Sequence, residues 1–321
     1  MSDAAWMAAA VALGDSARGT TAPNPNVGCV LVRDGALIGE GATAPGGRPH
    51  AEAVALGAAG AAVHGATAYV TLEPCAHESA RGPACAALLV EAGVARVVAA
   101  LGDPDPRTNG RGFALLLDAG VEVNVGEGDV EAARSLAGFL SRQRLGRPYV
   151  TLKLALSIDG RIATTSGESR WITGEEARED VHLERAKADM ILVGRGTYET
   201  DQPGLDVRIA GLEERSPRRA LLTTGVAPEG WTAISSPEAI ATLHDVNDLL
   251  VEGGAGAATA FLAADLVDRL IVYRAPILIG DGRAAVGDIG LGGLAEAHGR
   301  WISVESRLLG SDRRDVYERV R

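Results

Sequence analysis

Apolar and polar positions in the first 125 residues follow two alternating patterns. Short apolar runs rich in valine predict strands, whereas longer runs with apolar residues at helical spacing, or rich in alanine, predict helices. The predicted strands are residues 27–32, 36–40, 68–72, 94–101 and 121–125, and the predicted helices are residues 4–14, 51–62, 85–93 and 112–119. Strands that alternate with helices in this way predict an α/β sandwich around a mostly parallel or mixed sheet.

A polar segment with three arginines, residues 141–148, precedes a second apolar pattern. The strands predicted there are residues 149–156, 190–193, 220–223 and 248–251, then a stretch at 270–279 that Pro276 interrupts and a closing edge strand at 316–320. Helices are predicted at residues 174–188 and 259–266. The change of pattern predicts two domains, residues 1–145 and residues 146–321.

Composition narrows the class of protein without identifying a chemistry. The chain has 321 residues, enough for two domains, and its 46% of hydrophobic residues supply an ample core. The formal charge is 31 − 42 = −11, so the chain as a whole has no attraction for nucleic acid. Three cysteines give no disulfide framework and favour a reducing cytoplasm. Because no signal peptide and no membrane-spanning run is seen, we expect an intracellular protein without a membrane partner.

A histidine, a glutamate and two cysteines fall within one predicted supersecondary unit. His50 and Glu52 stand at the start of the helix predicted at 51–62, and Cys75 and Cys85 follow the next strand. One imidazole and two thiolates are typical zinc ligands, and three protein ligands leave a fourth position for water. Zinc lowers the pKa of bound water to about 7. Glu52 is placed to carry a proton to a leaving amine, an arrangement typical of zinc deaminases.

Two other interpretations of this group do not involve catalysis. In the first, Cys75 and Cys85 are small buried residues and His50 is a loop histidine, which leaves Pro74 unexplained. A proline directly before Cys75 suits a strand end followed by a helix or turn, where free amide groups stabilise a thiolate. In the second, a fourth protein ligand closes a structural zinc site and the second domain senses a nucleotide. His77 is the only local candidate for that ligand.

Two further segments carry weaker signals. Asn24 stands between two prolines, so its amide is held in place and can bind the polar edge of a heterocycle, although a simple turn-forming role fits equally well. Residues 252–257, Glu-Gly-Gly-Ala-Gly-Ala, lie between a predicted strand and a predicted helix. Glycines there let the backbone approach a pyrophosphate, whose charge the helix N-terminus stabilises. This pattern alone is a weak indication of a nucleotide site.

Five motifs of the first half together identify a family. They are Pro-Asn-Pro-Asn-Val-Gly-Cys (23–29), His-Ala-Glu (50–52), Thr-Leu-Glu-Pro-Cys-Ala-His (71–77), Pro-Ala-Cys (83–85) and Asp-Pro-Asp-Pro-Arg (103–107). With them this half resembles the deaminase half of the bifunctional deaminase–reductase of riboflavin biosynthesis. The resemblance implies a cytidine-deaminase-like three-layer α/β/α domain.

The resemblance also implies a role for particular residues of the first half. The implied roles are zinc ligands for His50, Cys75 and Cys85, proton shuttle for Glu52, and contact with a pyrimidine for Asn24 and His77. Two departures stand out. The loop of residues 76–84 is one residue longer than expected, with Arg81 as its only cation, where the family usually has a lysine or arginine. Asp105 occupies a position that is usually asparagine, so an acceptor-only carboxylate replaces an amide.

Motifs of the second half extend the resemblance to nearly the whole chain. They are Leu-Ala-Leu-Ser-Ile-Asp-Gly-Arg-Ile-Ala (154–163), Gly-Glu-Ser-Arg-Trp-Ile-Thr (167–173), Ile-Leu-Val-Gly-Arg-Gly-Thr (191–197) and the glycines of 252–257. This half is similar to the reductase half of the same family, which resembles dihydrofolate reductase in fold and uses NADPH. The implied NADPH contacts are Ala155, Trp171, Thr197, Asp201, Thr224, Gly254, Ala255, Gly256, Ala257, Ala258, Thr259 and Ala260. The implied substrate contacts are Ser169, Arg185, Leu205, Arg208 and Glu252.

Four charged residues of this half carry specific expectations from the resemblance. Arg185 and Arg208 are expected to bind the substrate phosphate through charge-assisted hydrogen bonds. Lys153 and Asp201 are expected nearest the sugar carbon that is reduced, in catalytic roles. Without the family, Lys153 is equally well an exposed strand lysine and Asp201 a loop cap.

The resemblance as a whole implies a two-step enzyme with zinc and NADPH as cofactors. We expect hydrolytic deamination of 2,5-diamino-6-ribosylamino-4(3H)-pyrimidinone 5′-phosphate, then reduction of the ribosyl group to ribityl. A homo-oligomer, dimer or tetramer, is expected on the same basis. Two rival interpretations are a deaminase–reductase acting on a related heterocycle of specialised metabolism, and a reductase whose deaminase domain is degenerate.

Overall fold

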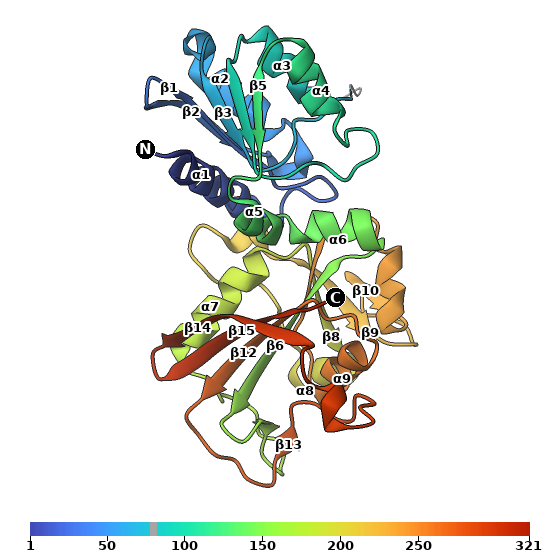
Figure 1. The fold of residues 1–321 in the computed structure, drawn as a ribbon. Coiled ribbons are helices and arrows are strands. Elements are labelled where there is room, and N and C mark those ends of the chain that lie inside the picture. Colours follow the sequence, from blue (N-terminus) through green and yellow to red (C-terminus); the bar gives the residue numbers. More distant parts are fainter. Residues whose placement is uncertain (78–81) are drawn as a thin grey trace. The chain divides into compact units, whose positions relative to one another are not determined.

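The structure is a computed structural model that describes residues 1–77 and 82–321. It divides into two compact units, Met1–Gly146 and Arg147–Arg321. Each unit has its own principal sheet with helices packed against it (Figure 1). Arg81, the only cation of the loop of residues 76–84, lies outside the described residues.

The first unit is built on a five-stranded mixed sheet with the order β2-β1-β3-β4-β5 in its described part. Its strands are β1 (Gly28–Arg33), β2 (Ala36–Ala42), β3 (Thr67–Val70), β4 (Arg96–Ala99) and β5 (Glu122–Val125). β1 pairs antiparallel with β2 and with β3, and β3, β4 and β5 run parallel. The parallel strands all end at one edge of the sheet, and the segment after β3 carries Cys75.

Helices cover both faces of this sheet. The helices of the first unit are α1 (Asp3–Ser16), α2 (Ala51–Ala59), α3 (Cys85–Glu91), α4 (Arg111–Asp118), α5 (Asp129–Ser135) and α6 (Ala137–Leu145). Cys29 and Leu31 pack in a core with residues of α2, α3, α4 and α6, whereas Val30 and Val32 pack with α1 and α5. Because side chains alternate between the faces of a strand, both cores are apolar and the domain has three layers.

The second unit has an eight-stranded sheet, with the order β10-β9-β8-β11-β6-β12-β15-β14 among the described residues. These strands are β6 (Tyr149–Ser157), β8 (Met190–Gly194), β9 (Arg218–Leu222), β10 (Trp231–Ile234), β11 (Asp248–Val251), β12 (Arg269–Ala275), β14 (Trp301–Leu309) and β15 (Asp312–Arg319). The first six in this order are parallel, and β15 pairs antiparallel with both β12 and β14. The short strands β7 (Arg161–Ala163) and β13 (Arg283–Ala284) form a separate pair.

Three helices accompany this sheet: α7 (Glu175–Ala186), α8 (Arg195–Asp201) and α9 (Ala255–Ala263). Ala177 and Val181 of α7 pack against Ile271 and Tyr273, whereas Phe261 of α9 belongs to a different buried cluster. Short 3-10 helices occur in both units. They are η1 (Pro45–Gly47) and η2 (Gly60–Val63) in the first, and η3 (Glu213–Arg215), η4 (Pro237–Thr242) and η5 (Leu294–Glu296) in the second. The predicted α/β class of this half is confirmed.

Several elements differ from those predicted from the pattern. No element was predicted at α5, α6, α8, β10 and β14, and α9 begins four residues earlier than predicted. The C-terminal strand predicted as an edge is β15, which is paired on both sides, so the edge strand is β14. Most side chains of β14 are exposed, and its sequence shows no regular apolar alternation. The hydrophobic pattern therefore does not predict this strand.

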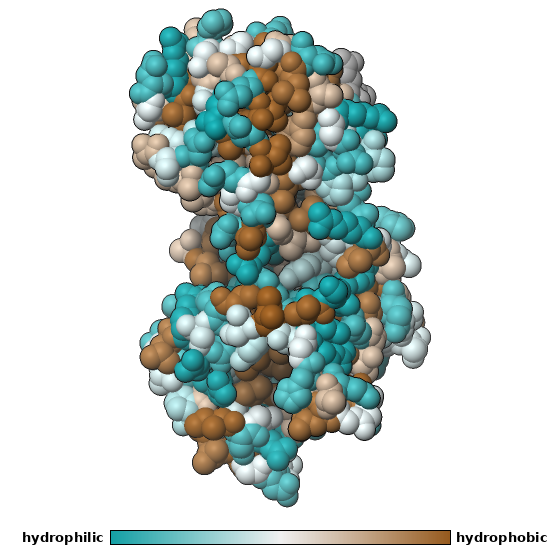
Figure 2. All heavy atoms as spheres, in the orientation of Figure 1, coloured by the Kyte–Doolittle hydropathy of each residue, from teal (hydrophilic) through white to brown (hydrophobic). Residues whose placement is uncertain are grey.

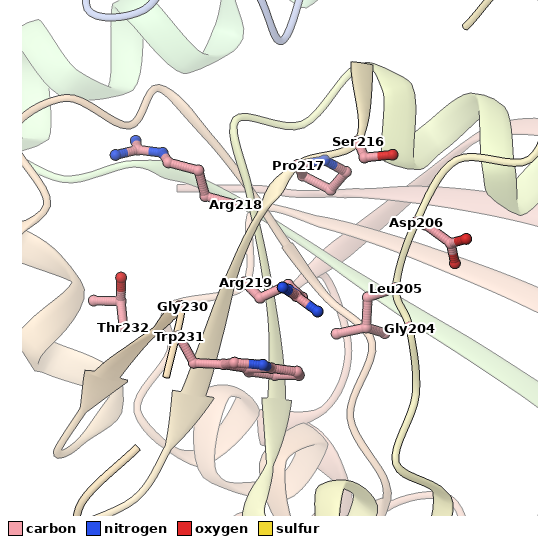
Figure 3. Close-up of a pocket in the computed structure, with 10 residues that line it drawn as sticks. All are labelled: Gly204, Leu205, Asp206, Ser216, Pro217, Arg218, Arg219, Gly230, Trp231 and Thr232. Carbon is pink, nitrogen blue, oxygen red and sulfur yellow. The ribbon is translucent and has the colours of Figure 1, made fainter. Parts of the chain in front are cut away.

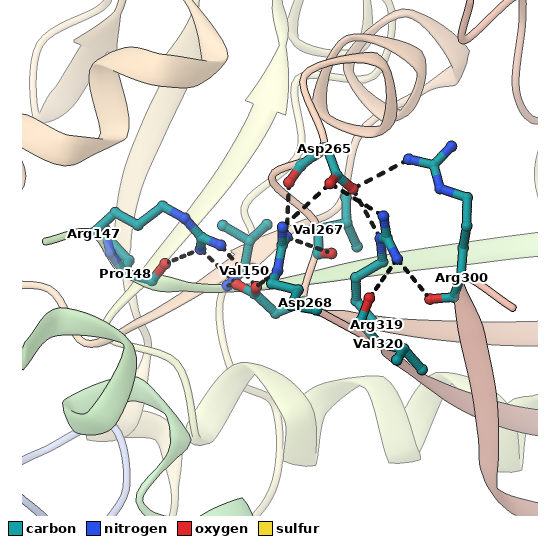
Figure 4. A network of polar contacts seen from close by, with 10 residues as sticks. Arg147, Pro148, Val150, Asp265, Val267, Asp268, Arg300, Arg319 and Val320 are labelled. Carbon is teal, nitrogen blue, oxygen red and sulfur yellow. Dashed lines mark hydrogen bonds and ion pairs between the residues drawn. The ribbon is translucent and has the colours of Figure 1, made fainter. Parts of the chain in front are cut away.

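A buried ion pair fixes the start of the second unit. Arg147 donates two hydrogen bonds to the Asp268 carboxylate, at 2.6 and 2.8 Å, and both residues are less than 9% exposed. Asp268 also accepts a hydrogen bond from the Val150 amide at 2.9 Å. Nearby, Asp265 accepts from Arg319 at 2.8 Å, so the polar network joins the first strand of the unit to its last (Figure 4). Loss of one partner of such a pair would leave a buried charge uncompensated.

The surface is mixed in polarity. On the face drawn in Figure 2, polar residues surround separate apolar patches on each unit. No helix within the described ranges is both long enough and apolar enough to cross a membrane.

Candidate active sites

His50, Cys75 and Cys85 come together in the first unit. His50 is the residue before α2, Cys75 follows β3, and Cys85 is the first residue of α3. The His50 Nδ1 atom lies 3.2 Å from the Cys85 sulfur and 3.6 Å from the Cys75 sulfur. The three ligand atoms all lie within 4.8 Å of one another, the only such cluster of three or more potential ligands among residues 1–77 and 82–321.

The chemistry of this donor set fits zinc. Two thiolates and one imidazole nitrogen are ligands that zinc prefers, and no fourth protein ligand joins them among the described residues. The Cys75 sulfur accepts a hydrogen bond from the Cys85 amide at 3.3 Å, at the N-terminus of α3. The hydrogen bond from the Cys85 thiol lowers the pKa of Cys75 to about 4, and that hydrogen bond and burial raise the pKa of Cys85. Cys75 is therefore set up to be a thiolate.

Glu52 lies one residue into α2 and is only 3% exposed. Burial raises the pKa of Glu52, and the nearby Cys75 thiolate raises it further. A carboxyl group with a raised pKa accepts a proton more readily than an ordinary glutamate, and a positioned carboxyl group serves as a general acid and base. Glu52 is thus a suitable proton carrier for a reaction at this cluster.

The two residues expected to contact a pyrimidine lie near the cluster in different ways. The Asn24 amide packs tightly on Gly47, three residues before His50. A Cβ atom added at Gly47 would lie only 1.9 Å from the Asn24 side-chain nitrogen. His77 approaches a loop that follows β4: its Nδ1 atom lies 3.5 Å from the Thr108 hydroxyl. His77 therefore has a neighbour of its own and is not part of the sulfur–imidazole cluster.

Asp105 does not present a bare carboxylate. Its oxygens accept four hydrogen bonds from the Arg107 backbone amide and guanidinium, the shortest at 2.5 Å. The Arg107 side chain is 66% exposed, whereas that of Asp105 is 10% exposed. The pair places hydrogen-bond donors at the surface of the loop where the family usually has an amide, so the acceptor-only character of Asp105 is compensated.

In the second unit, Lys153, Arg185 and Glu252 form one partly buried cluster. β11 runs beside β6 with Val251 opposite Leu152, which brings Glu252 level with Lys153. The Glu252 carboxylate accepts two hydrogen bonds from Arg185, at 2.6 and 3.0 Å, and its oxygen lies 3.6 Å from the Lys153 ammonium. Burial opposes ionisation of Glu252, but the two cations outweigh it and lower its pKa.

The loop after α8 completes this cluster. Arg185 donates to the Asp206 carbonyl at 2.9 Å, and the Asp206 carboxylate holds the exposed Arg208 guanidinium. The Arg208 amide donates to His182 at 3.2 Å. Leu205, also expected to contact substrate, is 4% exposed with φ of 57° and packs into the core instead of facing the charged groups.

The residues expected to contact NADPH lie on several elements: Ala155 is in β6, Thr197 and Asp201 are in α8, residues 255–260 are in α9, and Trp171, Thr224 and Gly254 are outside helices and strands. Thr197 in α8 accepts a hydrogen bond from the Gly254 amide at 3.0 Å, which joins two of these segments. Arg170 donates to the Asp201 carbonyl at 2.9 Å. The Trp171 ring is 69% exposed and lies under the Arg178 guanidinium, 4.9 Å from its centroid. The chain here offers a flat aromatic surface beside two polar loops.

The remaining expected residues differ in exposure and in secondary structure. Ser169 and Ala155 are partly exposed and Thr224 is exposed. Residues 255–260 form the first turns of α9, and Thr259 donates to the Ala255 carbonyl at 2.6 Å. Their part in cofactor or substrate binding stays a prediction.

Two polar residues escaped the sequence interpretation. Arg195 donates two hydrogen bonds to the Thr223 hydroxyl, at 2.9 and 2.6 Å, directly beside Thr224. Arg195 lies within the motif 191–197, from which only Thr197 was predicted to be a site residue. Glu73 is 3% exposed and accepts hydrogen bonds from backbone amides far along the chain. A short motif cannot predict these backbone donors, because they belong to a segment 30 to 40 residues later in the chain.

A surface depression of about 560 Å³ lies elsewhere on the second unit. Figure 3 shows Trp231 below Arg219, with Leu205 and Asp206 across the space from them. The Arg219 guanidinium lies 5.3 Å from the Trp231 ring centroid and partly fills the depression. Its lining contains Leu205 but none of Lys153, Arg185 and Glu252, so it is not the predicted substrate site.

Comparison with known proteins identifies both halves. Residues 1–101 match the family described as the cytidine and deoxycytidylate deaminase zinc-binding region, and residues 148–312 match the RibD C-terminal domain. The riboflavin biosynthesis protein RibD of Escherichia coli K12 is 42% identical over 346 residues, covering 92% of this chain and 94% of that protein. RibD of Mycobacterium tuberculosis H37Rv is 41% identical over 300 residues, 88% of each chain.

Solved structures agree with these matches over nearly the whole length. RibD of Acinetobacter baumannii is 37% identical and superposes with a TM-score of 0.88, covering 99% of both chains. A protein of Thermotoga maritima, described as a diaminohydroxyphosphoribosylaminopyrimidine deaminase/5-amino-6-(5-phosphoribosylamino)uracil reductase, is 29% identical with the same TM-score and coverage.

These similarities confirm the predicted fold class and the pairing of a zinc-dependent hydrolase with an NADPH-dependent oxidoreductase. They do not favour the interpretations in which the first domain is degenerate or acts on another heterocycle. The chain belongs to the RibD family of bifunctional deaminase–reductases of riboflavin biosynthesis.

Proposed function

We propose that the first unit deaminates 2,5-diamino-6-ribosylamino-4(3H)-pyrimidinone 5′-phosphate and that the second unit reduces the ribosyl group of the product to ribityl. The observation that carries the proposal is the placement of a buried Glu52 beside the His50, Cys75 and Cys85 cluster. The description of the Thermotoga maritima relative supports the choice of substrate, and the name of the Escherichia coli relative supports a part in riboflavin biosynthesis.

In the deaminase unit, His50, Cys75 and Cys85 hold the zinc ion. Zinc, when bound, supplies a Lewis acid that makes a coordinated water nucleophilic at neutral pH. Glu52 takes up one proton of the attacking water and delivers it to the ring nitrogen, then carries the second proton to the leaving amine, so that ammonia departs. Its burial keeps bulk water away from this transfer.

Asn24, His77 and Arg107 surround the place where the pyrimidine binds. Asn24 offers an amide that can pair with the polar edge of the ring, and its contact with Gly47 limits its movement. His77 contacts Thr108, and Arg107 presents its exposed guanidinium from the same loop. An arginine held by a carboxylate at its inner side keeps donors free for an anionic group of the substrate.

In the reductase unit, Lys153 and Asp201 lie nearest the sugar carbon that is reduced. NADPH, when bound, supplies the hydride. Lys153 donates a proton to the imine nitrogen as hydride adds to the sugar carbon of the open-chain form, and Glu252 holds the Lys153 ammonium in place at 3.6 Å. Arg185 has three of its five N–H donors engaged by Glu252 and Asp206, which leaves two for the substrate phosphate. Arg208 supplies a second cation.

Residues at the ends of β8 and β11 would hold the cofactor. The amide groups of the first turn of α9, from Ala255 onward, would bind its pyrophosphate, and the hydrogen bond from the Gly254 amide to Thr197 holds this segment. Trp171, Ala155, Thr224 and residues 255–260 make up the remainder of the site.

We also propose that the chain forms a homo-oligomer, a dimer or a tetramer, in the cytoplasm. The edge strand β14 supports this, since Ile302 and Leu308 on it are 50% and 71% exposed. Zinc ligation by two thiolates, Cys75 and Cys85, is consistent with a reducing compartment. Light scattering of the wild-type chain and of Leu308→Lys tests the oligomer, and a change to monomer in the variant is the expected result.

The substrate is tested by adding the diaminopyrimidine ribosyl phosphate to the zinc-loaded protein with NADPH. We expect one ammonia released and one NADPH oxidised per substrate, with ammonia appearing first. Cytidine and deoxycytidylate serve as comparison compounds, because a deaminase for another heterocycle would prefer one of them. A higher kcat/KM for either would overturn the proposed substrate while leaving the two chemistries in place.

A further inference from the structure

Glu73 belongs to the motif 71–77 but has no part in the chemistry proposed above. It is 3% exposed, lies two residues before Cys75, and its amide donates to the Leu101 carbonyl at 2.8 Å. A carboxylate buried this deeply needs hydrogen-bond donors that replace water. The structure supplies four, and all of them are backbone amides of one later segment.

The four donors lie at both ends of a loop. One carboxylate oxygen of Glu73 accepts from Asp103 at 3.1 Å and from Gly110 at 3.0 Å. The other accepts from Gly112 at 2.9 Å and from Phe113 at 3.3 Å. The carboxylate therefore closes the loop of residues 103–110 and satisfies amides in the first turn of α4. No side chain at the helix's own N-cap does so, and a negative charge there also complements the helix dipole.

The closed loop contacts the segment that carries Cys75 and His77. Thr108, which is fully buried, contacts His77, and Asp105 holds Arg107. Inside the loop, Asp103 accepts from the Asp105 amide at 2.9 Å, so these residues keep their positions relative to one another. The Glu73 carboxylate, two residues before Cys75, therefore fixes the loop relative to Cys75.

The backbone is shaped to permit this contact. A Cβ atom at Gly112 would lie 2.0 Å from the Pro74 carbonyl oxygen and 3.1 Å from the Glu73 carboxylate. Only glycine lets the first turn of α4 approach so closely. The sequence thus has two coordinated features, a buried acceptor at 73 and a missing side chain at 112, that bring the same two segments together.

We propose that Glu73 is a positioning residue for deamination: it holds the loop of residues 103–110 against the zinc site so that His77 and Arg107 meet the substrate in fixed positions. The inference rests on the proposed deaminase function. Glu73 contacts neither the substrate nor the metal in this account, and it acts through the loop alone.

The test is Glu73→Gln in the full-length zinc-loaded protein. A glutamine keeps the size of the side chain but turns an NH₂ group toward backbone amides, so at least two of the four hydrogen bonds are lost. Four quantities are measured: hydrogen exchange of the Asp103, Gly110, Gly112 and Phe113 amides, zinc content, KM and kcat for ammonia release, and reduction of pre-deaminated substrate. Glu91→Gln, which changes an exposed glutamate at the end of α3, is the matched control.

We expect the four amides to exchange at least tenfold faster in Glu73→Gln, with zinc content and reductase activity unchanged. The kcat/KM for ammonia release should fall at least tenfold, more through KM than through kcat, because Glu52 and the metal ligands stay in place. Glu91→Gln should match wild type in all four measurements. Gly112→Ala keeps the carboxylate but pushes the turn away, and it should reproduce the same split if Glu73→Gln does not accumulate.

Three results would overturn the inference. Unchanged amide exchange would mean that Glu73 does not hold the loop. Faster exchange with ammonia release within twofold of wild type would mean that the loop does not position the substrate. Loss of zinc in step with activity would mean that Glu73 acts through the metal ligands. Absence of ammonia release from wild type would instead remove the proposed function itself, while amide exchange in the variants would still report on the loop.

Discussion

Arg185 and Glu252 are 67 residues apart in the chain, yet they form a two-pronged ion pair with hydrogen bonds of 2.6 and 3.0 Å in the interior of the second unit. The carboxylate is 8% exposed and also lies 3.6 Å from the Lys153 ammonium. Glu252 therefore contacts both cations, and the positions of Lys153 and Arg185 depend on its carboxylate.

Replacement of that acid should disable the reductase and spare the deaminase. Glu252→Gln removes the charge that keeps Lys153 and Arg185 in place, and charge-assisted hydrogen bonds contribute about 1.5–3 kcal/mol each. We therefore expect kcat/KM for NADPH oxidation on deaminated substrate to fall about 10- to 100-fold. Ammonia release should stay unchanged. Arg218→Gln, which breaks the exposed pair with Asp245, is the control and should stay within twofold of wild type.

Metal removal should separate the two activities in the other direction. A chelator that strips zinc should abolish ammonia release and leave NADPH oxidation on deaminated substrate intact. Cys85→Ser should lower zinc content measured by atomic absorption, because a hydroxyl is a poor substitute for a thiolate. Cys29→Ala is the matched control, since Cys29 is buried in β1 outside the ligand cluster. Equal zinc loss in both variants would contradict the assignment of ligands.

Glu184 should make the second unit sensitive to acid. Burial alone would raise its pKa, but Arg269 and Arg314 outweigh burial and lower it from 4.5 to about 2. A lowered pKa in the folded state contributes stability that is present above pH 4.5 and is lost as the pH falls toward 2. Glu184→Gln should therefore cost on the order of 3 kcal/mol at pH 7, and the difference from wild type should shrink on acidification. Urea unfolding at pH 7, 4 and 3 measures it, and a pH-independent difference would refute the role of this carboxylate.

Thr197 should affect cofactor affinity more than substrate affinity. Thr197→Ala removes the acceptor of the Gly254 amide, a hydrogen bond of about 1 kcal/mol that orders the start of the helix proposed to bind the pyrophosphate. The Kd for NADPH, followed by fluorescence, should rise about fivefold, with KM for the deaminated substrate nearly unchanged. Thr242→Ala, which removes an exposed local hydrogen bond to Ala239, should leave both values as they are.

The sequence was most informative where chemistry depends on a few residue types in short motifs. His50, Glu52, Cys75 and Cys85 stand out because their types and spacing suit one metal chemistry, and the structure brings the three ligand atoms within 4.8 Å. The central strands were also predictable, because buried strands such as residues 28–33 and 190–194 are almost wholly apolar.

Other features depend on long-range contacts that no local pattern reports. The four amides bound by Glu73 come from residues 103–113, and the pairing of Asp105 with Arg107 replaces an expected amide in a way that only side-chain geometry reveals. β14 was missed because it has no regular apolar alternation and most of its side chains are exposed, and its strand state comes from pairing with β15. Such elements are determined by tertiary contacts more than by their own sequence.

The most direct test of the central claim compares wild type with Glu52→Gln, both loaded with zinc, on the diaminopyrimidine ribosyl phosphate. The account predicts that wild type releases ammonia and oxidises NADPH, whereas the variant keeps its zinc, loses ammonia release at least 100-fold and still reduces pre-deaminated substrate; proton transfer by a positioned carboxylate is worth about 10²–10⁴ in rate. Ammonia release at the wild-type rate from Glu52→Gln, or none from zinc-loaded wild type, would contradict it.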